Sequence, residues 1–234
     1  MKELLNTMRQ SMPRYNIIQP STGKMITFKP FTVKEEKTLL IANQTGSYED
    51  FLSTLADIID NCFDLPTPSK KLPLFDIEYF FLKLRSKSVG EVVEPVIICP
   101  ETKESIKINL NIDEIEPIFE AFHSNEFKIS NEILVKMKYP SLESLINNKN
   151  KDLDYFDLLI DSIYSIQTPN ELIEASTVSQ EYLKEFVELL TSAQYKKLID
   201  FFKTSPRLET EVKYTTSDGT DRVLMLKGLR DFFQ

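Results

Sequence analysis

The chain opens with two short apolar runs placed on either side of a turn. Within Tyr15–Phe31, the runs Ile17-Ile18 and Met25–Phe28 flank the turn-forming residues Pro20–Gly23. Two β-rich runs separated by a short segment with Pro and Gly are typical of a β-hairpin. We therefore expect a hairpin at the start of the fold.

Two helices are predicted after this hairpin. Thr32-Val33-Lys34-Glu35 fits a capping box, in which the Thr hydroxyl and the Glu carboxylate satisfy free backbone amides, so a helix should follow through Ile41. A second helix should start near Ser47, because apolar residues then return at helical spacing. These residues are Phe51, Leu55, Ile58, Ile59 and Cys62. This places Cys62 on a stripe that faces the core.

A broadly apolar helix is predicted over Asp76–Ser88, with Gly90 as its C-terminal stop. Ile77, Phe80, Phe81 and Leu84 form an i, i+3, i+4, i+7 stripe, which Tyr79 and Leu82 widen. Such breadth requires burial on two sides of the helix. The second side is covered either by this chain or in part by a partner, and the sequence favours the first.

The central part of the chain alternates in the manner of strands. Val92–Ile98 and Ile106–Ile112 predict a second hairpin, since apolar residues occupy every other position of the latter run. An acidic helix is predicted over Asp113–His123, with Pro117 in its first turn. One more strand is predicted over Val135–Tyr139.

The polar segment Asn147–Lys151 has no periodic apolar residue and predicts a linker. We expect an α+β domain with the N-terminal and central hairpins over residues 1–148, and a helical subdomain ending in a C-terminal hairpin over residues 149–234. Beyond the linker we predict three helices, over Leu153–Ile166, over Glu181–Leu190, and from a capping box at Thr191–Gln194 to Lys203. A hairpin of Glu211–Thr216 and Arg222–Leu226 should follow them. The predicted fold class is α+β, mostly helical with two or three β-hairpins and no parallel sheet.

Composition excludes several classes of function. A hydrophobic content of 41% is enough to build a core. The net charge of -8 makes the molecule as a whole repel a phosphate backbone, so nucleic acid is not an expected partner. Lys136 and Lys138 form the nearest basic patch, and two charges on one strand are typical of a solvated face. Cys62 and Cys99 are expected to be free thiols in a reducing compartment. We expect no signal peptide and no membrane span.

Residues that carry chemistry are few. His123 is the single histidine, which removes most triad and metal schemes, and the five scattered glycines form no phosphate-binding loop. We predict no catalytic residues and no cofactor. A hydrolase that uses an Asp/Glu pair is the remaining enzymatic alternative, although the chain has no Trp on which a sugar would stack.

Cys99-Pro100-Glu101-Thr102 lies at the tip of the central hairpin, where a zinc ribbon carries Cys-x-x-Cys. The second ligand position holds Thr102 instead of a cysteine, and no later cysteine pair exists. One thiolate does not make a structural zinc site, so we predict no metal site.

Three stretches taken together resemble the baseplate hub subunits and hub-assembly proteins of T4-like phages. They are Asn16–Lys24 with Phe31–Lys37, then Phe75–Glu91, then the hairpin at Cys99. The resemblance is strongest from Asn16 to Ile112, and Phe75–Glu91 is its most specific part; some relatives carry the fuller Cys-x-x-Cys. It implies a non-enzymatic role in building the hub of the tail baseplate, in the host cytoplasm during assembly and in the tail if the protein is retained.

Two kinds of surface are candidates for partner binding. The first is apolar and could anchor another hub or tape-measure protein; it consists of Leu229, Phe232 and Phe233 near the C-terminus, with Tyr79 and Leu82. Alternatively, the C-terminal side chains could fold back over the chain's own last hairpin. An acidic surface could steer a basic partner, or be only solvated. Its residues are Asp152, Asp154, Asp157, Asp161, Glu171, Glu174, Glu181, Glu185 and Glu188. The alternatives are a component that stays in the tail, as a monomer or a homo-oligomer, and a chaperone that leaves.

Overall fold

A computed structural model of the chain describes residues 2–45, 47–147 and 155–233. The contacts within it group into two compact units, unit 1 formed by residues 1–118 and 207–234, and unit 2 by residues 119–206. Unit 2 is therefore inserted in the sequence of unit 1. The boundary predicted between residues 148 and 149 falls in the segment 148–154, which lies outside the described residues.

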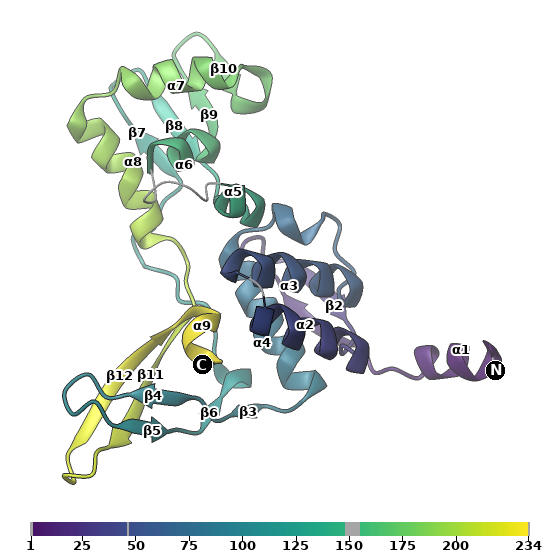
Figure 1. Cartoon of the computed structure of the whole chain (residues 1–234). Helices are drawn as coiled ribbons and strands as arrows, with labels where there is room; N and C mark the ends of the chain where they lie inside the picture. The colour runs from purple at the N-terminus through teal and green to yellow at the C-terminus, as the bar shows by residue number, and fades with distance from the viewer. Residues whose placement is uncertain (1, 46, 148–154, 234) are drawn as a thin grey trace. The chain divides into compact units, whose positions relative to one another are not determined.

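Unit 1 combines helices with hairpins (Figure 1). Its elements are α1 (Lys2–Gln10), β1 (Tyr15–Ile18), β2 (Met25–Phe28), α2 (Val33–Thr45), α3 (Tyr48–Cys62), η1 (Ser69–Lys71), α4 (Leu74–Ser88), β3 (Val92–Val93), β4 (Val96–Ile98), β5 (Ser105–Lys107), β6 (Leu110–Asn111), η2 (Ile112–Glu114), β11 (Glu209–Thr215), β12 (Asp221–Lys227) and α9 (Gly228–Phe232).

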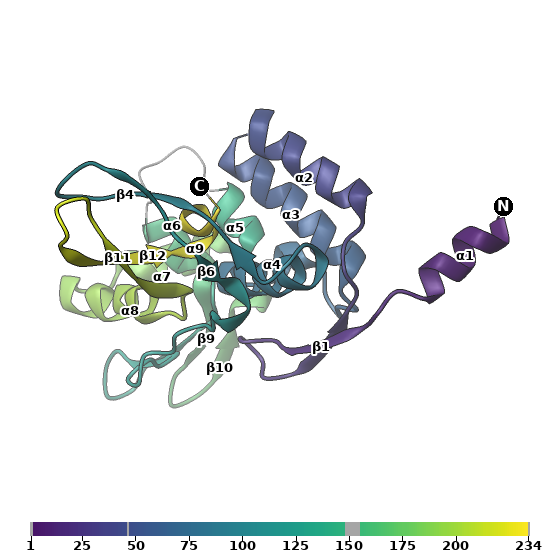
Figure 2. The ribbon, with the colours of Figure 1, turned by 90° about the horizontal axis from the view of Figure 1, so that it is seen from below.

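Helices α2 and α3 begin where the sequence predicts, and α4 begins at Leu74, two residues before the predicted Asp76. Ser47 and Asp50 form a reciprocal capping box at the start of α3, and Glu35 accepts a hydrogen bond of 2.9 Å from the backbone N–H of Thr32 before α2. α3 buries one stripe, which ends at Cys62. α4 is buried around most of its girth, so the second side of this helix is covered by the chain itself. Figure 2 shows α4 beside α3 in unit 1.

The hairpins of unit 1 confirm the β-patterns of the sequence. β1 pairs with β2, β4 with β5, β3 with β6, and β11 with β12, all antiparallel. Gly219 takes a φ of +80° in the last turn, a conformation that glycine adopts without steric cost. Phe28, Phe63 and Phe80 stack in sequence at centroid distances of 4.8 and 4.7 Å and join the first hairpin to α4.

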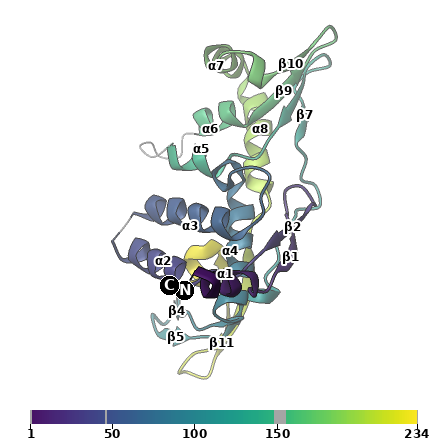
Figure 3. The same ribbon diagram turned by 90° about the vertical axis from the view of Figure 1, so that its right-hand side faces the viewer.

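Unit 2 is a four-stranded antiparallel sheet, in the order β10-β9-β8-β7, with helices on one face (Figure 3). Its core is continuous from the sheet to these helices and includes Val135, Ile163, Leu183 and Phe201. The elements are β7 (Glu126–Lys128), β8 (Leu134–Met137), α5 (Leu142–Asn147), α6 (Tyr155–Ser162), β9 (Ile163–Gln167), β10 (Leu172–Glu174), η3 (Ala175–Thr177), α7 (Gln180–Glu188) and α8 (Ser192–Thr204). Thr191 and Gln194 form the predicted capping box of α8.

Two helix predictions are wrong in part or in whole. The acidic helix over Asp113–His123 does not form, and the segment after the short turn η2 is extended. One reason is that Pro117 disfavours a helical conformation of the residue before it. The other is that side chains of α4 bind Asp113 and Glu116. The helix predicted to run to Ile166 ends at Ser162. Residues Ile163–Gln167 form a central strand instead, since pairing with β8 and β10 buries Ile163 and Ile166 in the sheet.

The fold class is α+β, as the sequence predicts, and every strand pair in the described ranges is antiparallel. Within those same ranges, none of the helices is both long and apolar enough to cross a bilayer.

Candidate functional site

The first turn of α4 holds the turn of the N-terminal hairpin through a buried carboxylate. Asp76 is completely buried and accepts hydrogen bonds from Gln19 Nε2 at 2.7 Å, from the backbone N–H of Ser21 at 2.9 Å and from the Ser21 hydroxyl. Burial raises the pKa of Asp76, and these three donors oppose the rise. Asp76 therefore fixes the position of the β1–β2 turn on α4.

One helical half-turn further on, a second buried carboxylate holds the C-terminal helix. Glu78 Oε1 accepts the backbone N–H of Leu229 at 3.4 Å, and burial raises the pKa of Glu78 to about 7. Gly228 has a φ of +65°, and a Cβ atom there would lie 2.7 Å from Glu78 Oε1. The close approach of α9 to α4 thus requires glycine at this position.

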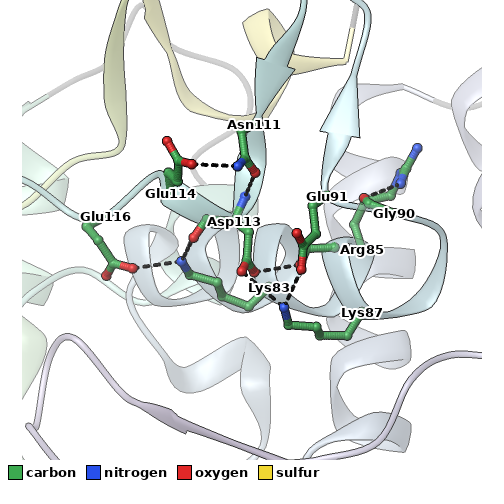
Figure 4. Close-up of polar contacts among 10 residues, drawn as sticks. Lys83, Arg85, Lys87, Gly90, Glu91, Asn111, Asp113, Glu114 and Glu116 are labelled. Atoms are coloured by element: carbon green, nitrogen blue, oxygen red, sulfur yellow. Dashed lines mark hydrogen bonds and ion pairs between the residues drawn. The ribbon is translucent and has the colours of Figure 1, made fainter.

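The middle of α4 binds the segment that follows the central hairpin. Tyr79 donates its hydroxyl to Glu116 at 2.7 Å. Figure 4 shows Lys83, whose Nζ lies 2.7 Å from the same carboxylate and also donates to the backbone oxygen of Asp113. Burial, together with the Glu116 carboxylate, raises the pKa of the Tyr79 phenol. The Lys83 side chain is largely buried while that of Glu116 is mostly exposed, so solvent still screens this ion pair in part.

The last turns of α4 bind the same segment and the start of the hairpin. Ser86 donates its hydroxyl to Asp113 at 2.6 Å. Lys87 forms ion pairs with Asp113 at 3.0 Å and with Glu91 at 2.8 Å (Figure 4). Burial acts against ionisation of Asp113, but Ser86 and Lys87 outweigh it and lower its pKa. Along its length, α4 therefore contacts the turn of the first hairpin, the C-terminal helix and the segment from Asp113 to Glu116.

Four of the five residues predicted to bind a partner lie on α4 and α9, and Phe233 directly follows α9. Tyr79, Leu82, Leu229 and Phe232 are buried within unit 1, and Phe233 is half-buried with its ring 5.4 Å from that of Phe81 in an edge-on contact. The C-terminal end packs on α4 through the Leu229–Glu78 and Phe233–Phe81 contacts, while the Tyr79 hydroxyl is bound to Glu116. Their use by a partner stays a prediction, and it would require α9 to leave α4.

His123 has a structural environment in unit 2. Its Nδ1 lies 2.9 Å from the Thr204 hydroxyl and its Nε2 lies 2.9 Å from the Tyr139 hydroxyl, while its ring stacks on Tyr139. Burial lowers the pKa of His123. Both ring nitrogens thus bind hydroxyl groups that join three separate segments of unit 2.

The two cysteines are free and buried in different places. Burial raises the pKa of the Cys62 thiol in α3 to about 11, which makes it a poor nucleophile. Cys99 begins the turn between β4 and β5, and its thiol lies 3.2 Å from Glu101 Oε2.

The predicted charged surfaces lie on unit 2. Lys136 pairs with Glu126 at 3.2 Å and Lys138 is exposed. Of the acidic residues, Asp152 and Asp154 lie outside the described residues, Asp157 and Asp161 are half-buried, and Glu171, Glu174, Glu181, Glu185 and Glu188 are exposed.

An exposed apolar stripe on unit 1 was missed by the sequence interpretation. Val92, Val96 and Ile98 are 57%, 50% and 62% exposed, on the outer face of the central hairpin. The consecutive apolar residues of Val92–Ile98 were the available signal, because they place apolar side chains on both faces of a strand, and one of the two faces in a small antiparallel sheet can remain in solvent.

Comparison with known proteins identifies the family. A family model described as T4 bacteriophage base plate protein matches residues 12–234, nearly the whole chain. The searches of curated proteins and of solved structures found no match to this chain. The matched region contains the four segments that α4 joins: the hairpin turn at Ser21, the segment at Asp113, the start of the central hairpin and the tail at Leu229. The chain therefore belongs to the T4 bacteriophage base plate protein family.

Proposed function

We propose that this protein is a component or assembly factor of the baseplate hub and acts through protein–protein contacts. The observation that carries the proposal is the arrangement around α4, where the polar side chains are used to hold together the segments of unit 1. Such a unit presents a fixed surface to its neighbours, as a structural part of an assembly must.

The proposal includes the absence of catalysis. His123, Asp76 and Glu78 have the environment of structural groups, because their polar atoms bind neighbours within the same unit. The alternative is a hydrolase with an Asp/Glu pair. Incubation of the pure protein with peptidoglycan distinguishes the two, since the release of sugar fragments over hours would refute the proposal.

A component that is retained and a chaperone that leaves are both compatible with the family. Quantitative mass spectrometry of purified tails separates them: a stoichiometric copy number identifies a component, and absence from mature tails identifies a chaperone. For a component we expect localisation in the tail baseplate of the virion.

The partners that we propose are other hub proteins or the tape-measure protein. The exposed stripe of Val92, Val96 and Ile98 offers an apolar contact of limited size, suited to one of several interfaces in a larger assembly. The acidic residues of unit 2 would steer a partner with basic segments, so association should slow as salt is added. Replacing Val96 and Ile98 by Ser should weaken capture of hub proteins from infected cells, while Ser replacements at the exposed Leu172 and Tyr164 of unit 2 serve as the control.

A further inference from the structure

The tips of two hairpins meet in unit 1. Ser217, in the turn between β11 and β12, donates its backbone N–H to Glu104 Oε2 at 3.1 Å, and its hydroxyl donates to the same carboxylate. These two residues are 113 positions apart in the sequence, one before and one after unit 2. Figure 1 shows the corresponding hairpins side by side.

Both tips are tight turns of similar construction. In the first, Lys103 donates its N–H to the Cys99 oxygen at 2.9 Å and has a φ of +61°. In the second, Gly219 donates its N–H to the Thr216 oxygen at 2.9 Å and has a φ of +80°. Two such turns facing each other resemble a zinc ribbon, where each turn supplies two ligands to one ion.

The side chains of these turns do not fit a zinc ion. Cys99 is the single thiol, Thr102 occupies the next ligand position, and Thr216 stands at the corresponding place in the second turn. Interaction with Cys99, together with burial, raises the pKa of the buried Tyr214 to about 12. Structural zinc sites use four thiolate or imidazole ligands. Across the described ranges, no three His, Cys, Asp or Glu residues are placed to share an ion.

A protein cation lies between the turns instead. Arg222 Nε donates to the Thr216 hydroxyl at 3.2 Å, its Nη2 lies 3.4 Å from Asp218 Oδ2, and its Nη1 lies 3.5 Å from Glu101 Oε2. Three nitrogens of one guanidinium thus contact oxygens from both hairpin tips, and the Arg222 side chain is mostly buried. Hydrogen bonds from Thr216 and Thr220, with the charge of Arg222, lower the pKa of Asp218 to about 2, so Asp218 stays negative.

We infer that Arg222 is the cation that joins the two hairpin tips, in the role that a metal ion has in a zinc ribbon. The planar guanidinium suits this role because its nitrogens point in fixed directions toward several oxygens at once. The contact attaches the C-terminal segment 207–234 to the hairpin of β4 and β5, which precedes the inserted unit 2 in the sequence. Added salt should weaken this contact because it screens the charges, whereas a chelator should have no effect on it.

Hydrogen exchange at the two tips tests this inference, on the full chain purified without chelator. Arg222→Gln removes the charge, and Lys213→Gln, at an exposed position on the outer face of β11, is the matched control. We expect Arg222→Gln to speed amide exchange in residues 99–104 and 216–220 by roughly tenfold and to lower Tm by about 2–4 °C. The Lys213 control should leave both the exchange rate and Tm unchanged, and EDTA should not change the exchange rate of the native chain at the two tips.

Two results would overturn the inference. One is a metal ion present in stoichiometric amount by elemental analysis, together with faster exchange at the tips after EDTA. The other is equal exchange at the tips in the Arg222 and Lys213 variants. If the Arg222 variant does not fold, the test is amide exchange of the native chain at high salt. The inference requires faster exchange at the two hairpin tips under that condition, and an unchanged exchange rate there would contradict it.

Discussion

The buried carboxylate of Glu78 should make the stability of this protein depend on pH in a way that one substitution removes. Burial raises the pKa of Glu78 from 4.5 to about 7 in the folded chain, so the folded state favours the protonated acid. The stabilisation that this provides is fully present below pH 4.5 and is lost as the pH rises through 7. Stability should therefore fall between pH 5 and pH 8.

The size of the effect follows from the shift. A difference of about 2.5 pKa units corresponds to about 3 kcal/mol at 1.36 kcal/mol per unit. For a chain of this length, that free energy corresponds to about 6–12 °C in Tm. Glu78→Gln keeps the shape and an oxygen that can accept the Leu229 N–H, while it removes the ionisable group.

The assay is the thermal melt of the native chain and of Glu78→Gln at several pH values from 5 to 8. His123 contributes with the opposite sign, because its lowered pKa favours the neutral ring and so adds stability as the pH rises. This contribution is common to both proteins and cancels in their difference. The control is Glu211→Gln, at an exposed position on β11.

We expect Tm of the Gln variant to exceed that of the native chain at pH 8, with the gap closing toward pH 5. Parallel curves for the two proteins across this range would refute the assignment of Glu78 as a buried ionisable group. The Glu211 variant should follow the native chain throughout.

Three further substitutions test the packing of unit 1 by urea unfolding. Phe80→Ala should reduce the free energy of unfolding by about 3–5 kcal/mol, since this ring is fully buried, and a loss of a few tenths would mean that the ring faces solvent. Gly228→Ala should cost about 1–3 kcal/mol, because its Cβ would meet Glu78 at a positive φ, and an unchanged midpoint would show that α9 is not seated on α4. Phe232→Ser should also cost about 3 kcal/mol or more. If it instead leaves the melt unchanged and abolishes partner capture, α9 is a partner-binding segment.

Elements that rest on neighbouring residues could be predicted from the sequence. The helix start near Ser47, the capping box at Thr191, and the turns of the first, central and last hairpins need only side chains within a few positions of one another. The wide apolar girth of α4 likewise predicted burial on two sides, which the structure confirms.

Elements that depend on distant partners could not be predicted in this way. Ile163–Gln167 has a pattern compatible with a helix, and it becomes a strand because β8 and β10 offer hydrogen bonds on both of its edges. The segment after Asp113 is extended because Ser86, Lys87 and Lys83 bind its carboxylates, which are too far away in sequence for a local pattern to include.

The same distinction holds for the candidate site. The sequence alone shows that His123, Cys62 and Cys99 do not form a common nucleophilic or metal-binding motif, since residue types and spacing suffice for that conclusion. Only the tertiary structure places Asp76 against Ser21, Glu78 against Leu229 and Arg222 between two turns. The physical reason is that a buried charge must find its partners wherever the folded chain brings them, and those partners are set by three-dimensional packing and not by sequence distance.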